Sequence, residues 1–191
     1  MSTYPIEYTR TRNINTPRYW DVAAKRMRDI TSGSVRVVRR VKAILDGLPA
    51  MPVQEYGFGH THLGGRLEPG IWHGFDFSPR TVEDAEERGL RATLRRCGDA
   101  EDPGCACVVA LETLEHLDHE EMMRFLNAVQ TAPRAFFSVP LMSLRDTRFP
   151  QHMRGFGGGP DLIAFLQKWW PKVKQEVVRP HWRMAHCWRP A

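Results

Sequence analysis

The spacing of apolar residues along the chain follows two different periods. Between Tyr19 and Leu48 they recur mostly every three or four positions, which is typical of a helix, and the run Thr31-Ser32-Gly33-Ser34 interrupts this pattern. We therefore expect two helices in this region, or one broken helix. The continuous apolar run from Cys107 to Leu111 is instead typical of a buried strand.

Further short elements follow the same two patterns. We expect strands at about 52–57, 71–77, 90–94, 107–111, 135–139, 173–178 and 182–188. We expect helices from about residue 61, from Ser78 to Gly89, and over 119–129 and 160–170, with Ser78 as an N-cap before Pro79. This alternation implies a parallel, doubly wound α/β sheet.

The composition predicts one globular domain. A chain of 191 residues can bury about two-thirds of the surface that its unfolded form exposes. Apolar residues make up 42% of it, and no apolar run approaches the roughly 20 residues of a membrane span. Residues 1–19 lack the apolar block of a signal peptide, so we expect a cytosolic (cytoplasmic) protein. We expect residues 1–50 to form an arm and helices that pack on a core of residues 51–191.

The net charge does not identify the partner, and the cysteines give no sign of a zinc site or disulfides. The chain has 27 basic and 22 acidic residues, a net charge of +5, with much of the excess between Arg10 and Arg40. This charge suits a nucleic acid or another anionic partner, but solvated helix faces explain it about as well. The four cysteines have neither zinc-site spacing nor the density of a disulfide scaffold, so we expect them to be reduced.

A glycine-rich turn follows the first expected strand of the core. Glu55, Gly57 and Gly59 lie at its end, and a second glycine pair follows at Gly64-Gly65. Glycine adopts dihedral angles that a Cβ would forbid and adds no bulk, so backbone N–H groups in such a turn can approach a ligand closely. The segment therefore predicts an α/β cofactor site.

Acidic residues follow the next strands. Asp76 ends the second strand, where an acid in an open α/β sheet can accept hydrogen bonds from ribose hydroxyls. Asp99 follows the third strand in Cys97-Gly98-Asp99-Ala100, and the fourth strand ends in Leu111-Glu112-Thr113-Leu114-Glu115-His116.

Together these signals resemble class I S-adenosylmethionine-dependent methyltransferases of the type 11/12 group, which includes ubiquinone-biosynthesis O-methyltransferases. The resemblance covers about residues 50–190. It implies a Rossmann-like fold with a seven-stranded, mostly parallel sheet, helices on both faces and an antiparallel last strand. It also implies that the protein binds S-adenosylmethionine.

The resemblance assigns cofactor contacts residue by residue. The amino-acid part would meet Glu55, Gly57 and Gly59, with His60 beside the methionine moiety. Asp76 would hold the ribose, Phe77 would line the adenine and Asp99 would meet its amino group. The implied cofactor set is Glu55, Gly57, Gly59, His60, Asp76, Phe77, Asp99, Ala100 and Leu111.

The segment Glu112-x-x-Glu115-His116 predicts a metal site. These three side chains share one helical face if the chain turns helically after the strand. Similar segments in the ubiquinone-biosynthesis enzymes and in small-RNA 3′-terminal 2′-O-methyltransferases bind a divalent cation together with a later histidine, which implies His152 as the fourth ligand. Mg²⁺ would suit the carboxylates, and imidazoles also accept Mn²⁺, Zn²⁺ or Fe²⁺.

Two other interpretations of this segment stay open. Glu115 and His116 can instead cap or solvate the next helix. Without a metal, His116 or His152 becomes a candidate general base, because a free imidazole titrates near neutral pH.

The predicted reaction is methyl transfer to a hydroxyl oxygen of a small molecule, assisted by the metal if one binds. A first alternative is an RNA ribose 2′-O-methyltransferase, favoured by the positive charge. A second is a non-catalytic methyltransferase-like binding protein, favoured by Thr61 where a third glycine is common and Ala106 where an acid is frequent. A monomer and a homodimer are both compatible with the sequence.

Overall fold

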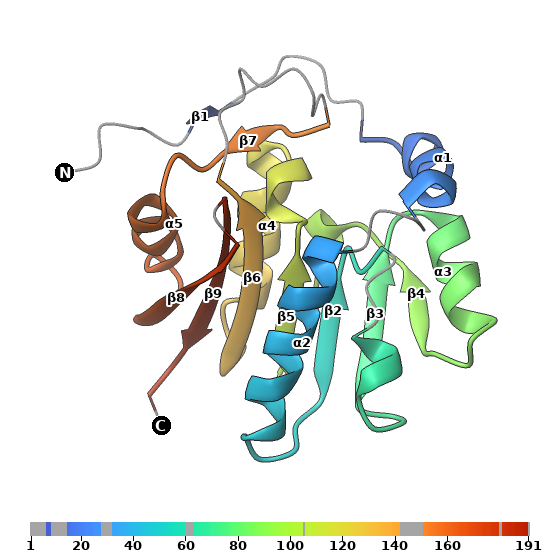
Figure 1. Cartoon of the computed structure of the whole chain (residues 1–191), viewed down its shortest axis with the longest axis horizontal. Helices are drawn as coiled ribbons and strands as arrows, with labels where there is room; N and C mark the ends of the chain where they lie inside the picture. The colour runs from blue at the N-terminus through green and yellow to red at the C-terminus, as the bar shows by residue number, and fades with distance from the viewer. Residues whose placement is uncertain are drawn as a thin grey trace.

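A large, mostly parallel sheet organises the protein. The computed structural model describes residues 7–8, 15–27, 32–59, 63–104, 106–141, 151–179 and 181–190. Within these residues a seven-stranded sheet has the order β4-β3-β2-β5-β6-β9-β8 (Figure 1). Its strands are β2 (Val53–Tyr56), β3 (Trp72–Asp76), β4 (Ala92–Leu94), β5 (Cys107–Leu111), β6 (Arg134–Pro140), β8 (Lys172–Arg179) and β9 (Trp182–Trp188).

The strand directions confirm the predicted topology. The pairs β2–β3, β2–β5, β3–β4 and β5–β6 are parallel, whereas β9 runs antiparallel to both of its neighbours, β6 and β8. Because the carboxyl ends of parallel strands meet at one edge of the sheet, the segments that follow β2, β3, β5 and β6 converge there.

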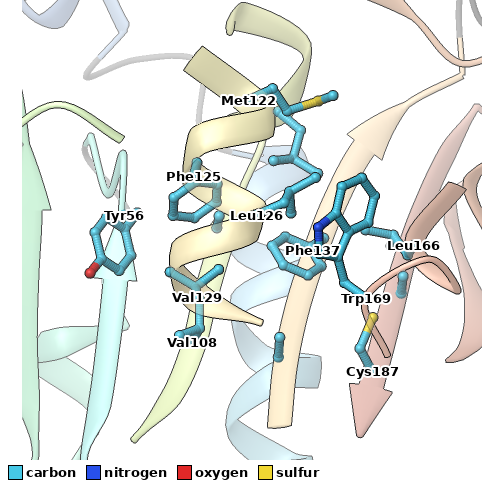
Figure 2. Packing of buried hydrophobic residues seen from close by; sticks show 14 of the residues in the cluster. Tyr56, Val108, Met122, Phe125, Leu126, Val129, Phe137, Leu166, Trp169 and Cys187 are labelled. Atoms are coloured by element: carbon cyan, nitrogen blue, oxygen red, sulfur yellow. The ribbon is translucent and has the colours of Figure 1, made fainter. Parts of the chain in front are cut away.

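Helices cover both faces of the sheet. The helices are α1 (Pro17–Met27), α2 (Ser32–Asp46), α3 (Pro79–Glu86), α4 (His119–Val129) and α5 (Gly159–Leu166). Buried residues of α2 and α3 share one hydrophobic cluster with the sheet, and those of α4 and α5 share the other. In Figure 2, Phe125 lies on the side of α4 that faces Tyr56 of β2, and Leu126 on the side that faces Phe137 of β6. Helix α1 lies beside α3 (Figure 1).

Local sequence signals set the ends of two helices. Ser78 caps α3, since its Oγ accepts a hydrogen bond from the Thr81 N–H at 3.2 Å. Asp118 caps α4 in the same way and accepts a hydrogen bond from the Glu121 N–H at 2.8 Å. The predicted bounds of α4 and β5 match the structure.

The helix expected from residue 61 is wrong. The described part of this segment contains a single 3-10 turn, η1 (Gly64–Arg66). A Cβ on Gly64 would come within 2.7 Å of the Trp72 ring, and one on Gly74 within 2.2 Å of it. The indole therefore packs directly against two glycines, one of which begins η1. The helix expected over 160–170 also ends early, at Leu166.

A second, small sheet was not predicted. Strand β1 (Glu7–Tyr8) pairs antiparallel with β7 (Arg154–Gly155). Two residues per strand are too few for a recognisable alternation of apolar and polar positions. In the described part of the chain, no helix has the length and apolar character needed to span a bilayer.

Candidate active site

The turn after β2 has the geometry that the sequence predicts. Gly57 and Gly59 both adopt left-handed conformations, with φ of +63° and +50°. The Gly57 N–H donates to the Phe75 carbonyl at 2.8 Å, and a Cβ on Gly57 would come within 2.7 Å of the Thr113 side chain. A Cβ on Gly59 would meet no atom of the described residues within 4 Å. The turn is thus packed on one side and open at Gly59.

Asp76 joins this turn to the start of α3. Its side chain is buried, with 6% exposure. Oδ2 accepts a hydrogen bond from the Gly59 N–H at 3.0 Å, and Oδ1 accepts one from the Ser78 N–H at 2.9 Å. The structure therefore brings the predicted ribose-binding acid into direct contact with the predicted glycine turn.

The other predicted cofactor residues occupy different environments. Glu55 is fully buried at 0% exposure, and its Oε2 accepts a hydrogen bond from the Trp72 indole at 2.8 Å, so this acid lies beneath the turn. Phe77 follows β3, and the Arg96 guanidinium lies 5.7 Å from its ring centroid. Asp99 is exposed in the 3-10 turn η2 (Cys97–Asp99).

The last three predicted cofactor residues are Ala100, Leu111 and His60. Ala100 is half-buried directly after η2, and Leu111 is buried at the end of β5. His60 lies outside the described residues.

A cluster of metal-ligand side chains forms after β5. The chain there enters a 3-10 turn, η3 (Leu114–His116), which includes Glu115 and His116 but not Glu112. One ligand atom each from Glu115, His116 and His152 lies within 4.8 Å of the other two. The Met153 N–H donates to the Glu115 carbonyl at 2.7 Å, and this bond holds the His152 segment against η3. Three of the four predicted metal ligands are therefore together.

Glu112, the fourth predicted ligand, does not join this cluster. Among the described residues it is the one non-glycine residue with a positive φ, +54°. Its N–H donates to the Ser138 carbonyl at 3.0 Å, and the Ser138 hydroxyl donates to its Oε1 at 2.6 Å. Sequence reasoning missed Ser138, although a lone hydroxyl inside the buried strand β6 was an available signal.

Burial sets the protonation of these groups. It raises the pKa of Glu112 to about 8, against which the Ser138 hydrogen bond acts only in part. Burial and the nearby Glu112 carboxyl hold the pKa of Glu115 well above its usual range. Burial and the nearby His152 lower the pKa of His116 to about 3, so this imidazole is neutral at neutral pH.

Hydrogen bonding indicates the tautomer of His116. Its Nδ1 lies 3.3 Å from the Gln151 carbonyl oxygen, which can only accept, so Nδ1 carries the proton. The lone pair is then on Nε2, which lies 4.0 Å from Glu115 Oε1. This is the arrangement usual for a metal-ligating histidine, whose second ring nitrogen donates to a carbonyl or carboxylate.

The raised pKa of Glu112 predicts how stability depends on pH without metal. Between pH 4.5 and about 8 the folded protein holds a proton on Glu112 that the unfolded chain has lost, so the contribution of Glu112 to the free energy of unfolding should fall as pH rises through this range. Glu112→Gln should remove about 1–3 kcal/mol of this fall. Urea unfolding in EDTA measures it. The control Glu120→Gln alters an exposed side chain (86%) and should keep the wild-type slope. Equal slopes in wild type and Glu112→Gln would contradict the assignment.

Comparison with known proteins shows which fold this chain shares. No protein-family model matches the sequence, and no curated protein matches it. Among solved structures, DhpI in complex with SAH (S-adenosylhomocysteine) aligns with a TM-score of 0.69 at 19% identity, over 92% of this chain and 96% of DhpI.

Two further solved structures show the same likeness. Magnesium protoporphyrin IX methyltransferase (ChlM) from Synechocystis PCC 6803 with bound SAH gives a TM-score of 0.65 at 19% identity, over 85% of this chain and 86% of ChlM. The methyltransferase domain of the bacterial protein CtHen1-CN gives 0.62 at 15% identity, over 80% of this chain and 97% of that domain. The chain therefore has the Rossmann-like fold of class I S-adenosylmethionine-dependent methyltransferases.

Proposed function

We propose that this chain is an S-adenosylmethionine-dependent methyltransferase that methylates a hydroxyl oxygen of a small molecule with the help of a divalent cation. The observation that carries the proposal is the position of the Glu115–His116–His152 cluster next to the glycine turn. Thr113 contacts Gly57 directly, and Glu115 follows two residues later in the chain. A cofactor at the turn and an acceptor at the cluster would then be neighbours.

The residues at the turn suit the cofactor. The space beyond Gly59 is open, and its left-handed backbone is one that glycine adopts without strain. Asp76 accepts hydrogen bonds from the Gly59 and Ser78 N–H groups, so its carboxylate lies at the turn, where an acid in an open α/β sheet can accept ribose hydroxyls. DhpI and ChlM, which have this fold, are solved with SAH bound. These points support the same cofactor here.

The cluster suits a divalent cation. Glu115 is 1% exposed, and in the described structure its Oε2 has no hydrogen-bond partner. Buried carboxylate oxygens without partners are rare in proteins, and a cation would supply the missing partner. One carboxylate and two imidazoles favour Mn²⁺, Fe²⁺ or Zn²⁺, while Mg²⁺ would require more oxygen ligands.

The chemistry follows from these ligands. When bound, the cation lowers the pKa of a coordinated hydroxyl, and S-adenosylmethionine supplies an electrophilic methyl group. Glu115, His116 and His152 would hold the cation and in this way orient the acceptor. A pKa of about 3 makes His116 a weak base at neutral pH, which favours a ligand role over general-base catalysis.

Asp76→Asn tests the cofactor site. One oxygen becomes an NH₂ group facing a backbone N–H and a ribose hydroxyl can no longer donate to it, so affinity for SAH should fall about 10-fold or more. Calorimetric titration measures this. Asp102→Asn is the matched control, because Asp102 also accepts a backbone N–H, from Gly104, but precedes β5 at the opposite edge of the sheet. No SAH binding by the wild type would favour the non-catalytic binding protein.

Glu115→Gln tests the metal site. A carboxamide is a much weaker ligand than a carboxylate, so we expect Mn²⁺ affinity to fall about 10-fold or more while SAH affinity stays within about twofold. The exposed Glu120→Gln serves again as control. Equal losses of metal and SAH affinity would show a shared or structural role for Glu115 instead.

A basic surface favours RNA as the second candidate acceptor. Arg36 and Arg39 are exposed on α2, and Lys172 and Lys174 are exposed on β8. The acid beside them, Glu176, is bound by Arg40 through two hydrogen bonds of 2.6 and 2.9 Å. Among the described residues none of the four forms an ion pair within 4.0 Å, and Glu176, which Lys174 also attracts, is the one acid named here, so positive charge is in excess.

Binding to a labelled oligoribonucleotide separates the two candidates. If RNA is the acceptor, its affinity should fall steeply between about 50 and 200 mM salt and should fall further in Lys172→Glu/Lys174→Glu. Fluorescence anisotropy measures both effects, and SAH affinity serves as the control for folding. Absence of salt-sensitive binding would leave the small-molecule acceptor as the proposal.

A further inference from the structure

The side chain of Asn15 bridges the two segments that carry the histidines. Its Nδ2 donates to the His116 carbonyl at 2.8 Å and to the Gln151 carbonyl at 2.8 Å. Its Oδ1 accepts from the Trp20 indole N–H at 3.2 Å. The side chain is buried, with 9% exposure. Both amide hydrogens are thus used to join one backbone position of each histidine segment.

This bridge bears on the orientation of both imidazoles. The Gln151 carbonyl accepts from Asn15 and also from His116 Nδ1, and His152 is the next residue. The two imidazole ring centroids lie 4.9 Å apart, and the Trp20 ring packs edge-on against His116 at 4.8 Å. Removing the Asn15 donors would free the Gln151 carbonyl to move, and with it the hydrogen bond that selects the His116 tautomer.

The same N-terminal segment is also attached to the cofactor side. Six residues after Asn15, Asp21 in α1 accepts a hydrogen bond from the Ser78 hydroxyl at 2.6 Å. Ser78 is fully buried, and its N–H donates to Asp76. Residues 15–21 therefore contact the histidine pair at one end and the neighbour of the ribose-binding acid at the other.

We propose that Asn15 is a positioning residue for the His116–His152 pair, and that residues 15–21 couple the binding of S-adenosylmethionine to the binding of the divalent cation. This inference rests on the proposed function. A ligand on either side stabilises the docked position of the segment, so each ligand should bind more tightly when the other is present. Such coupling is reciprocal, and typical values change an affinity 5–150-fold.

The experiment is a Mn²⁺ titration of the full chain by calorimetry, with and without saturating SAH. In the wild type we expect SAH to tighten Mn²⁺ binding about fivefold or more. In Asn15→Asp, a carboxylate of the same shape faces two carbonyl oxygens and both donors are lost, so the enhancement should fall below about twofold. The inference is overturned if the wild type shows no enhancement, or if Asn15→Asp keeps it.

Two other variants separate coupling from general damage. Asn127→Asp is the matched control: this exposed side chain uses only its Oδ1, which accepts from the Trp169 indole at 2.8 Å, and that acceptor is retained. It should behave as the wild type. Asp21→Ala removes only the contact with Ser78, so the enhancement should disappear while Mn²⁺ affinity without SAH stays within about twofold. An unchanged enhancement in Asp21→Ala would disprove the connection through α1.

A metal-free measurement keeps the outcomes distinct. The ¹⁵N resonances of His116, assigned with His116→Gln, report which ring nitrogen carries the proton. We expect the Nδ1–H tautomer in the wild type and a mixture in Asn15→Asp. Absence of SAH or Mn²⁺ binding by the wild type would refute the proposed function or its metal, and the tautomer would then decide the role of Asn15. The same tautomer in both proteins would refute that role.

Discussion

The contact between Thr113 and Gly57 holds the two halves of the candidate site together. Thr113 Oγ1 lies 3.2 Å from the Tyr56 carbonyl, 3.1 Å from the Leu111 carbonyl and 3.4 Å from the Gly57 carbonyl, so one hydroxyl spans the ends of β2 and β5. A side chain at position 57 would push this hydroxyl away. The left-handed turn and the metal-ligand cluster consequently depend on the same close approach of two parallel strands.

The buried acids and imidazoles are costly to the fold, and this cost is informative. Burial raises the pKa of Glu112 and Glu115 and lowers that of His116, so the acids are held toward their protonated form and the imidazole in its neutral form. Apolar residues at these positions would avoid the cost. Groups with strongly perturbed pKa values are typical of functional sites. This is the physical reason for interpreting the Glu115–His116–His152 cluster as a functional site and not only as part of the packed interior.

Sequence reasoning succeeded where the determining forces are local. The run Cys107–Leu111 is buried on both faces, and Asp118 caps α4, so both elements could be delimited from neighbouring residues alone. The 3-10 turn that contains Glu115 and His116 is local as well. The helix expected from residue 61 failed because Trp72, a residue of the next strand, packs against Gly64.

Contacts between residues far apart in the sequence also decide which site residues lie together. The sequence pattern does not reveal these contacts. Nothing in the motif around Glu55 shows that its carboxylate points inward to the Trp72 indole. The approach of His152 to His116 depends on the hydrogen bond between Met153 and Glu115, which lie 38 positions apart in the sequence. The bridging amide of Asn15 became visible only in the structure.

The two connections between the half-sites differ in kind. Thr113 acts through the backbone of two buried strands, which ligand binding cannot easily displace because the whole core would have to move. Residues 15–21 are instead attached through three side-chain hydrogen bonds of Asn15 and Asp21, and a short segment held by so few contacts can open locally at a smaller cost than global unfolding. In the proposed mechanism, coupling between cofactor and cation runs through the N-terminal segment, whereas Thr113 holds the two half-sites at a fixed separation.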